Sequence, residues 1–206
     1  MYRPPHFREE RKEVLHAAMA GIGFAALVSQ GLDATQMPLL LDADDGELGT
    51  LSGHMARANP HWKAAAGEGL AIFLGPHAYV SPNWYPSKAE HGKAVPTWNY
   101  IAVHARGIIT VHDDPAWLRA NLEKLTAAHE AGRPAPWKVS DAPEAYIAAQ
   151  LKGIVGISLR ITALEGNWKL SQNKADADHE GVRAALVAEG ADVAGLMKPR
   201  KQDGST

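Results

Sequence analysis

The chain has 206 residues, of which 46% are hydrophobic and 21% charged, a balance typical of a globular protein and not of a disordered or fibrous one. It has no cysteine, which excludes a disulfide framework, a thiolate metal site and a cysteine nucleophile. The 21 basic and 23 acidic residues give a net charge of −2, which is not the charge of a nucleic-acid-binding domain. The N-terminus has no apolar core of a signal peptide, and no apolar run reaches the ~18 residues of a membrane span. We therefore expect a cytoplasmic protein with no membrane contact.

The N-terminal half predicts one helix followed by short strands. The helix is expected over residues 8–20, where apolar residues recur at helical spacing on one stripe. The sequence Asp44-Asp45-Gly46 is a strong hairpin signal. Short apolar segments bounded by turn residues predict strands at residues 23–29, 35–42, 48–53, 70–74 and 78–81.

The C-terminal half mixes long alternating segments with helices. Apolar and polar residues alternate over residues 95–106 and 155–163, which indicates half-buried strands. The segment Glu165-Gly166-Asn167 predicts a turn between the second of these strands and a further strand. Capping residues and apolar stripes predict helices after Asp113 or Asp114, near residues 143–151 and at 178–189.

Six to nine short strands that do not alternate with helices disfavour a doubly wound parallel sheet. We expect a mainly β protein, a closed or split antiparallel β-barrel with peripheral helices. Neither a repeat nor a long linker divides the chain, so a single domain is predicted over residues 1–197, followed by a disordered tail at 198–206.

The ten histidines lack the spacing of a metal motif, and no metal site is expected. Nucleophile-elbow, P-loop and dinucleotide-binding motifs are also absent from the sequence. No residue stands out as a catalytic acid or base.

Residues 48–60 have the composition of a phosphate cradle. A strand delivers Thr50 and Ser52, Gly53 lets the backbone turn, and His54 and Arg57 follow where a helix is expected to start. The alternative is structural: Ser52 caps the helix and Arg57 is solvated.

Two further segments could border a ligand. Trp84, Tyr85, Trp98 and Tyr100 lie in irregular polar sequence and could form a wall for a planar ligand or a subunit contact, although core packing of Trp98 is the simpler interpretation. The polar sequence WKLSQNK, residues 168–174, is either the rim of a ligand site or a solvated strand end.

Five segments resemble the PaiB family of FMN-binding negative transcriptional regulators, in order and over nearly the whole chain. They are MYRPPHF, LSGHMARANPHW, FLGPHAYVSPNWYPSK, VPTWNYIAVHARG and LEGNWKLSQNK. Two positions depart from the family pattern: Gln36 stands where a histidine is usual, and Asn167 stands where a lysine is usual.

The resemblance implies a split barrel of the flavin reductase and pyridoxamine oxidase type, in which a homodimer holds FMN in a cleft between its subunits. The segment expected at the FMN phosphate consists of Thr50, Leu51, Ser52, Gly53, His54 and Arg57. The segment expected to approach the flavin from the other subunit consists of Trp168, Lys169, Ser171, Gln172 and Asn173. Trp84, Tyr85 and Trp98 are expected near the flavin ring or the interface.

The resemblance favours a negative transcriptional regulator. The net charge and the absence of a helix-turn-helix pattern disfavour direct DNA binding, so we expect regulation through a protein partner or the redox state of the flavin. The alternative is a flavin-dependent oxidoreductase acting on a small molecule, by analogy with other split barrels. A haem-handling barrel is a third hypothesis, which the many histidines allow.

Overall fold

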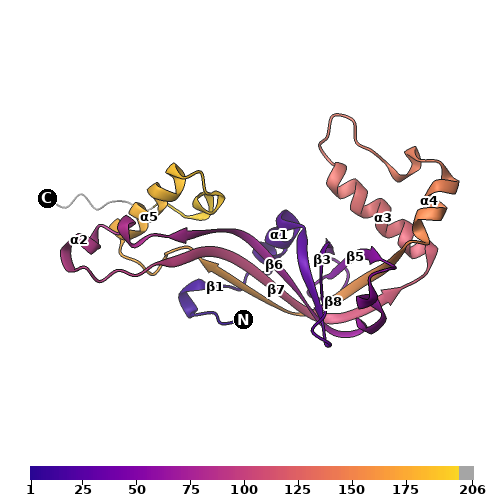
Figure 1. The fold of residues 1–206 in the computed structure, drawn as a ribbon, viewed down its shortest axis with the longest axis horizontal. Coiled ribbons are helices and arrows are strands. Elements are labelled where there is room, and N and C mark those ends of the chain that lie inside the picture. The colour runs from indigo at the N-terminus through magenta and orange to yellow at the C-terminus, as the bar shows by residue number, and fades with distance from the viewer. Residues whose placement is uncertain (200–206) are drawn as a thin grey trace. The chain divides into compact units, whose positions relative to one another are not determined.

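The computed structural model describes residues 1–199, and all of its strands belong to one sheet (Figure 1). The strands are β1 (Arg8–Glu9), β2 (Phe24–Ser29), β3 (Ala34–Pro38), β4 (Leu40–Asp42), β5 (Thr50–Ala56), β6 (Gly67–Val80), β7 (Thr97–His112) and β8 (Ile154–Lys169). The α-helices are α1 (Lys12–Ile22), α2 (Ser87–His91), α3 (Pro115–Glu130), α4 (Glu144–Leu151) and α5 (Asp176–Ala188).

The sheet has the order β3-β2-β6-β7-β8-β5-β4, and β1 pairs with β8 outside this path. β2 pairs antiparallel with β3 and β6, and β5 pairs antiparallel with β4 and β8. The expectation of a mainly β protein with an antiparallel sheet and peripheral helices is confirmed.

The described residues form two compact units. The terminal unit comprises residues 1–10, 74–103 and 165 onward, and the central unit comprises residues 11–73 and 104–164. The single domain over residues 1–197 stays a prediction. Residues 200–206 of the expected tail lie outside the described part of the chain.

Alternating side chains build the core of the central unit. Val155, Ile157 and Leu159 of β8 are fully buried, as the alternation in the sequence predicts. Leu51 of β5 is also fully buried, and its backbone pairs with that of Leu159. The same face of the sheet is therefore apolar along adjacent strands.

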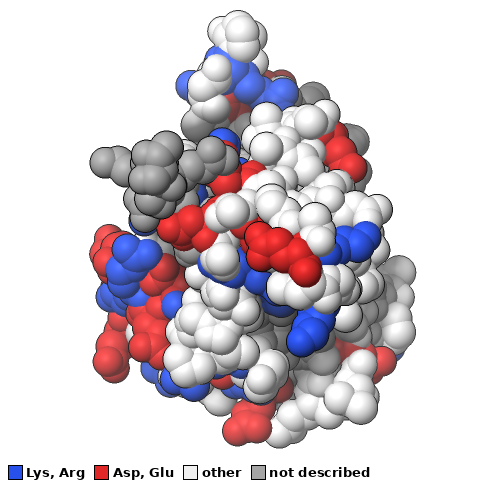
Figure 2. Space-filling model, turned by 90° about the vertical axis from the view of Figure 1, so that its left-hand side faces the viewer, with Lys and Arg blue, Asp and Glu red and all other residues white. Residues whose placement is uncertain are grey.

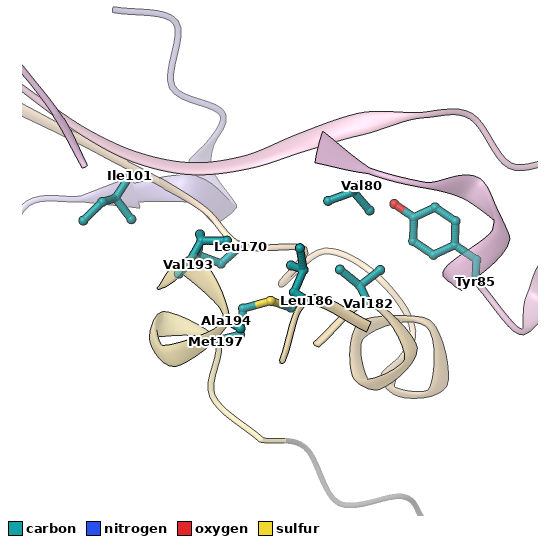
Figure 3. Close-up of a cluster of buried hydrophobic side chains, with 9 residues drawn as sticks. All are labelled: Val80, Tyr85, Ile101, Leu170, Val182, Leu186, Val193, Ala194 and Met197. Atoms are coloured by element: carbon teal, nitrogen blue, oxygen red, sulfur yellow. The ribbon is translucent and has the colours of Figure 1, made fainter. Parts of the chain in front are cut away.

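The core of the terminal unit is a cluster of nine buried residues, which Figure 3 shows between the strands, α5 and the C-terminal 3₁₀ turn. Val182 and Leu186 of α5 are fully buried in it. Gly181 lets this helix lie close to the chain at Trp84, because a Cβ on it would stand 2.3 Å from the Trp84 carbonyl oxygen. The remaining members are Val80, Tyr85, Ile101, Leu170, Val193, Ala194 and Met197.

Two expected turns are wrong. The strand predicted to end at Gly53 runs on to Ala56, and no helix begins at residues 54–57. The turn predicted at residues 165–167 is the continuous end of β8, where Asn167 and Gly166 pair with Arg8 and Glu9 of β1. In both places a glycine sits inside a strand instead of ending one.

Candidate functional site

Strand β5 divides the predicted phosphate segment between two faces. Thr50, Ser52 and His54 point to one face, whereas Leu51 and Gly53 point to the other, into the core. A Cβ on Gly53 would stand 2.6 Å from the Pro38 carbonyl oxygen, so this glycine permits tight packing and not a turn. The predicted cradle of helix-terminal amides is therefore not formed.

The outward face of β5 borders a polar cavity beneath helix α3. This α3 cavity has a volume of about 310 Å³ and lies wholly within the central unit. Thr50 and Ser52 line it, and the Thr50 hydroxyl donates to the Asp45 carbonyl at 2.9 Å. Its other lining residues are Asp42, Asp45, His112, Trp117, Ala120, Asn121, Lys124 and Ser158.

A histidine–serine pair lies in the wall of the α3 cavity. His112 Nε2 and Ser158 Oγ are 2.7 Å apart, and the His112 ring stacks on Trp117 with centroids 3.9 Å apart and planes 4° from parallel. Burial lowers the pKa of His112, so the neutral ring is favoured. A neutral ring can act as either the donor or the acceptor of the bond to Ser158.

Arg57 is engaged away from the α3 cavity. Its guanidinium makes a bidentate pair with the Asp113 carboxylate and donates to the carbonyls of Lys152 and Ile154 at 2.9 and 3.0 Å. The hydrogen bond to Asp113 is the main cause of the raised pKa of Arg57. These bonds occupy Nε, Nη1 and Nη2, which leaves Arg57 poorly placed to hold a phosphate.

His54 carries an unsatisfied buried atom. Its side chain is half-buried, and Nδ1 has no hydrogen-bond partner among the described residues. Burial lowers the pKa of His54. A buried ring nitrogen without a partner is an exception in a folded protein, and a bound water or ligand is one explanation for it.

In the terminal unit, exposed aromatic side chains gather on β6 and β7. Trp98 is 52% exposed, and its ring contacts Tyr79 edge-on at 6.0 Å and His77 at 6.3 Å between centroids. The simpler interpretation of Trp98 as a core residue is therefore wrong. We call Trp98, Tyr79 and His77 the aromatic surface.

Lys169 of β8 lies beside Trp98 of β7. Its ammonium donates to Thr97 Oγ1 at 2.6 Å and to the Trp98 carbonyl, and it lies 6.0 Å from the Phe7 ring centroid. Burial, and to a lesser extent the charge of Lys174, lowers the pKa of Lys169.

Tyr85 belongs to the hydrophobic cluster and not to the aromatic surface. Tyr85 is 4% exposed, its hydroxyl has no partner among the described residues, and the Lys174 ammonium lies 4.9 Å from its ring centroid. Burial raises the pKa of Tyr85. Trp84 is half-buried and packs against the same cluster.

The predicted segment 168–173 folds back on itself. Gln172 accepts from the Leu170 amide at 2.7 Å and donates to the Trp168 carbonyl. Ser171 is buried and donates to Asn99 Oδ1 at 3.0 Å. Trp168 is half-buried, and Asn173 is exposed, so the hydrogen bonds made by Ser171 and Gln172 support local structure.

The predicted residues thus divide between the two units, and only part of each set shares one surface or cavity. The flavin-contact roles of all of them stay predictions. Sequence reasoning missed the members of the α3 cavity that come from β7, α3 and β8. The one local signal was Asn121, a polar residue within the apolar stripe of α3.

Metal-ligand groups and membrane-spanning helices are both absent from residues 1–199. No three or more histidine, cysteine, aspartate or glutamate side chains in this part of the chain converge in a group that could hold a metal. Within the same residues, no helix combines the length and apolarity needed to cross a membrane.

Comparison with known proteins places the chain among flavin-related sequences. Residues 1–163 match the family described as "Putative FMN-binding domain". The chain belongs to this family. A Bacillus subtilis relative, "Protease synthase and sporulation protein PAI 2", is 32% identical over 194 residues that cover 92% of this chain and 90% of that protein. An uncharacterized Aspergillus fumigatus protein is 36% identical over 217 residues, and the match covers 84% of this chain and 83% of that protein. The resemblance to the PaiB family is confirmed.

Solved structures bear out the fold. The flavocytochrome Anf3 from Azotobacter vinelandii superposes with a TM-score of 0.58 at 14% identity, covering 82% of this chain and 72% of that one. The FAD and haem binding protein from Mycobacterium smegmatis superposes with a TM-score of 0.57 at 16% identity, and the match covers 89% of this chain and 80% of that one. This PaiB-type chain therefore has the split-barrel fold.

Proposed function

We propose that this protein binds FMN between the two subunits of a homodimer. The observation that carries the proposal is the aromatic surface, where Trp98 is half exposed and its ring contacts that of Tyr79. Exposed aromatic side chains that gather on one surface are characteristic of binding sites, and a planar isoalloxazine ring suits such a surface. Membership of the FMN-binding domain family supports the same ligand and favours FMN over FAD.

The residues of the two sets fit complementary parts of this ligand. Trp98 and Lys169 of one subunit would hold the ring, and Ser52 and His54 of the other subunit would meet the ribityl chain. The unsatisfied Nδ1 of His54 is the kind of buried atom that a bound ligand would pair. FMN when bound supplies hydride and one-electron chemistry, whereas the chain supplies placement and electrostatics.

The absorbance spectrum of the purified protein, before and after addition of FMN, tests the ligand. We expect flavin bands near ~375 and ~450 nm that survive dialysis. Trp98→Ala should weaken FMN binding by about tenfold or more, the scale of one aromatic contact. Trp137→Ala is the matched control, because Trp137 is 46% exposed and lies outside the aromatic surface. Equal affinities of the two variants would contradict the proposed site.

Mixing of variants tests the shared site. Trp98→Ala and His54→Leu would each damage both sites of their own homodimer, if each site takes one residue from each subunit. A heterodimer of the two variants, isolated through two affinity tags, should regain about half of the wild-type FMN sites, because one of its two sites is intact. A heterodimer that binds no FMN would contradict the shared site.

We further propose that the role in the cell is regulatory and indirect. The Bacillus subtilis relative is named for protease synthase and sporulation, which supports a regulatory role. The net charge of −2 disfavours direct DNA binding, and Figure 2 shows acidic and basic side chains interspersed on the face it presents.

Gel shifts over a salt series should give no tight complex, and steeply salt-dependent operator binding would overturn the indirect route. Reduction of bound FMN by a reduced nicotinamide would instead favour the flavin-dependent oxidoreductase.

A further inference from the structure

We infer that the α3 cavity binds an uncharged, polyhydroxylated ligand. The inner wall of the cavity is polar but neutral, since it carries the hydroxyls of Ser52 and Ser158, the ring of His112 and the amide of Asn121. These groups come from β5, β7, β8 and α3, so the fold gathers them from four separate parts of the chain.

Asn121 is the residue that most directly calls for a ligand. It is 5% exposed, it lines the cavity, and its Nδ2 has no hydrogen-bond partner among the described residues. Its neighbours on the buried side of α3 are Leu118 and Leu125, so the folded chain alone would be better served by an apolar residue at this position. A buried amide without a partner is costly, and a ligand that accepts its hydrogen bond removes that cost.

The charges around the cavity argue against a phosphate. The charged lining residues are Asp42, Asp45 and Lys124, which sum to −1. Lys124 is 63% exposed and lies 3.4 Å from Asp42, so its charge is already partly neutralised and mostly in water. An anion entering the cavity would meet two carboxylates and no buried cation among the described lining residues.

Hydroxyl groups satisfy every other feature of the wall. Each hydroxyl both donates and accepts, so it can accept from Asn121 and donate to a carboxylate or a serine oxygen. The indole of Trp117 adds an apolar side for the carbon skeleton. A volume of about 310 Å³ accommodates a chain or ring of five or six carbons. Free sugar alcohols have this chemistry, and so does the ribityl chain of a flavin.

The test follows the α3 cavity by NMR in the full-length protein during titration with ribitol, through the side-chain amide of Asn121 in the wild type and the backbone amides of Ser52 and Ser158 in wild type and variant, and measures riboflavin and lumiflavin affinity by fluorescence. Lumiflavin has the flavin ring but no ribityl chain. The variant is Asn121→Leu. The matched control is Thr126→Val, another polar-to-apolar change on α3 at a residue that lines a different cavity.

Two results would support the inference. Ribitol shifts the Asn121 signals, and Asn121→Leu weakens its binding at least tenfold; this result identifies a free polyol. Alternatively, Asn121→Leu weakens riboflavin at least tenfold and leaves lumiflavin unchanged; this result identifies the ribityl chain. Thr126→Val should leave both affinities unchanged.

Other results would overturn it. If neither ribitol nor riboflavin binding depends on Asn121, or if inorganic phosphate alone shifts the Asn121 signals, the cavity is not a polyol site. Asn121→Leu would then act only on stability. The ribitol titration is independent of the proposed function. If ribitol binds and no flavin binds, the proposal of flavin binding is refuted and the proposal of a polyol site is retained.

Discussion

Gly156→Ala tests whether the wall of the α3 cavity is built on a close approach of helix to strand. Gly156 is buried in β8, opposite His54 of β5. A Cβ on it would stand 2.2 Å from Cζ3 of Trp117 and 3.1 Å from Cβ of His112. The Trp117 ring already stacks on His112, so it cannot move freely aside.

The expected cost follows from this contact. Overpacking a well-packed site costs about 1–3 kcal/mol. For a protein of this size, each kcal/mol lowers the melting temperature by about 2–4 °C. Gly156→Ala should therefore lower the melting temperature by about 2–12 °C, and near-UV circular dichroism should change because Trp117 leaves its stack with His112. The assay is thermal unfolding followed by circular dichroism in the far-UV and in the near-UV.

Gly21→Ala is the matched control. Gly21 lies in α1, is exposed, and has no atom within 4 Å of an added Cβ. The same substitution should there stabilise the protein by about 0.5–1 kcal/mol, because alanine loses less conformational entropy in a helix. If Gly156→Ala is as stable as Gly21→Ala, the close packing of Trp117 on β8 is refuted.

Three further predictions concern other parts of the molecule. Leu186→Ala should destabilise the protein by about 2–5 kcal/mol in urea unfolding, whereas the exposed neighbour Val187→Ala should change stability little. Arg57→Ala should leave FMN affinity unchanged in a fluorescence titration, because the Arg57 guanidinium is already bonded within the protein. A large loss of FMN affinity would show that Arg57 contacts the flavin. Burial lowers the pKa values of His54 and His112 below their usual 6.5, so the unfolded chain takes up protons first as the pH falls below 6.5. Stability should fall as the pH drops below 6.5, and the variant with both histidines changed to glutamine should lose less; equal losses would contradict the assignment.

The sequence predicted the parts of the fold that depend on local periodicity. The alternation at residues 95–106 and 155–163 corresponds to β7 and β8, and the helix expected at 178–189 corresponds to α5. Alternation records which face of a strand is buried, and burial is a property that each strand carries in its own residues.

Glycine was the main source of error, because its local signal has two physical origins. Gly53 and Gly166 were interpreted as turns, but both lie within strands. At Gly53 the reason is the Pro38 carbonyl, which leaves no room for a side chain. Only the neighbouring strand distinguishes this case from a turn, and the neighbouring strand is not visible in the local sequence.

The α3 cavity could not be predicted for a related reason. Ser52 was proposed as a ligand residue, but Ser158, His112 and Asn121 are 60 or more residues away along the chain. Ser158 and His112 are unremarkable in their own segments, and Asn121 stands out only as a polar residue in an apolar stripe. The three form one polar wall with Ser52 only after α3 packs on β5 and β8 pairs with β5. Sites assembled across a sheet in this way leave no motif of fixed spacing.

The segment WKLSQNK shows that a family-typical motif can serve folding more than binding. Ser171 adopts a left-handed backbone with φ of 60°, and its carbonyl oxygen lies 3.2 Å from Nδ1 of His179. The other ring nitrogen of His179 lies 3.0 Å from the carbonyl oxygen of Lys198, so the histidine ties the turn at Ser171 to the C-terminal segment. Ser171 also donates to the fully buried Asn99. The polar side chains of this motif are therefore used largely within the terminal unit. Asn173 is the exposed member of the motif, so a variant at this position is expected to separate ligand binding from folding, whereas a variant of Lys169 would also lose its bonds to Thr97 and Trp98.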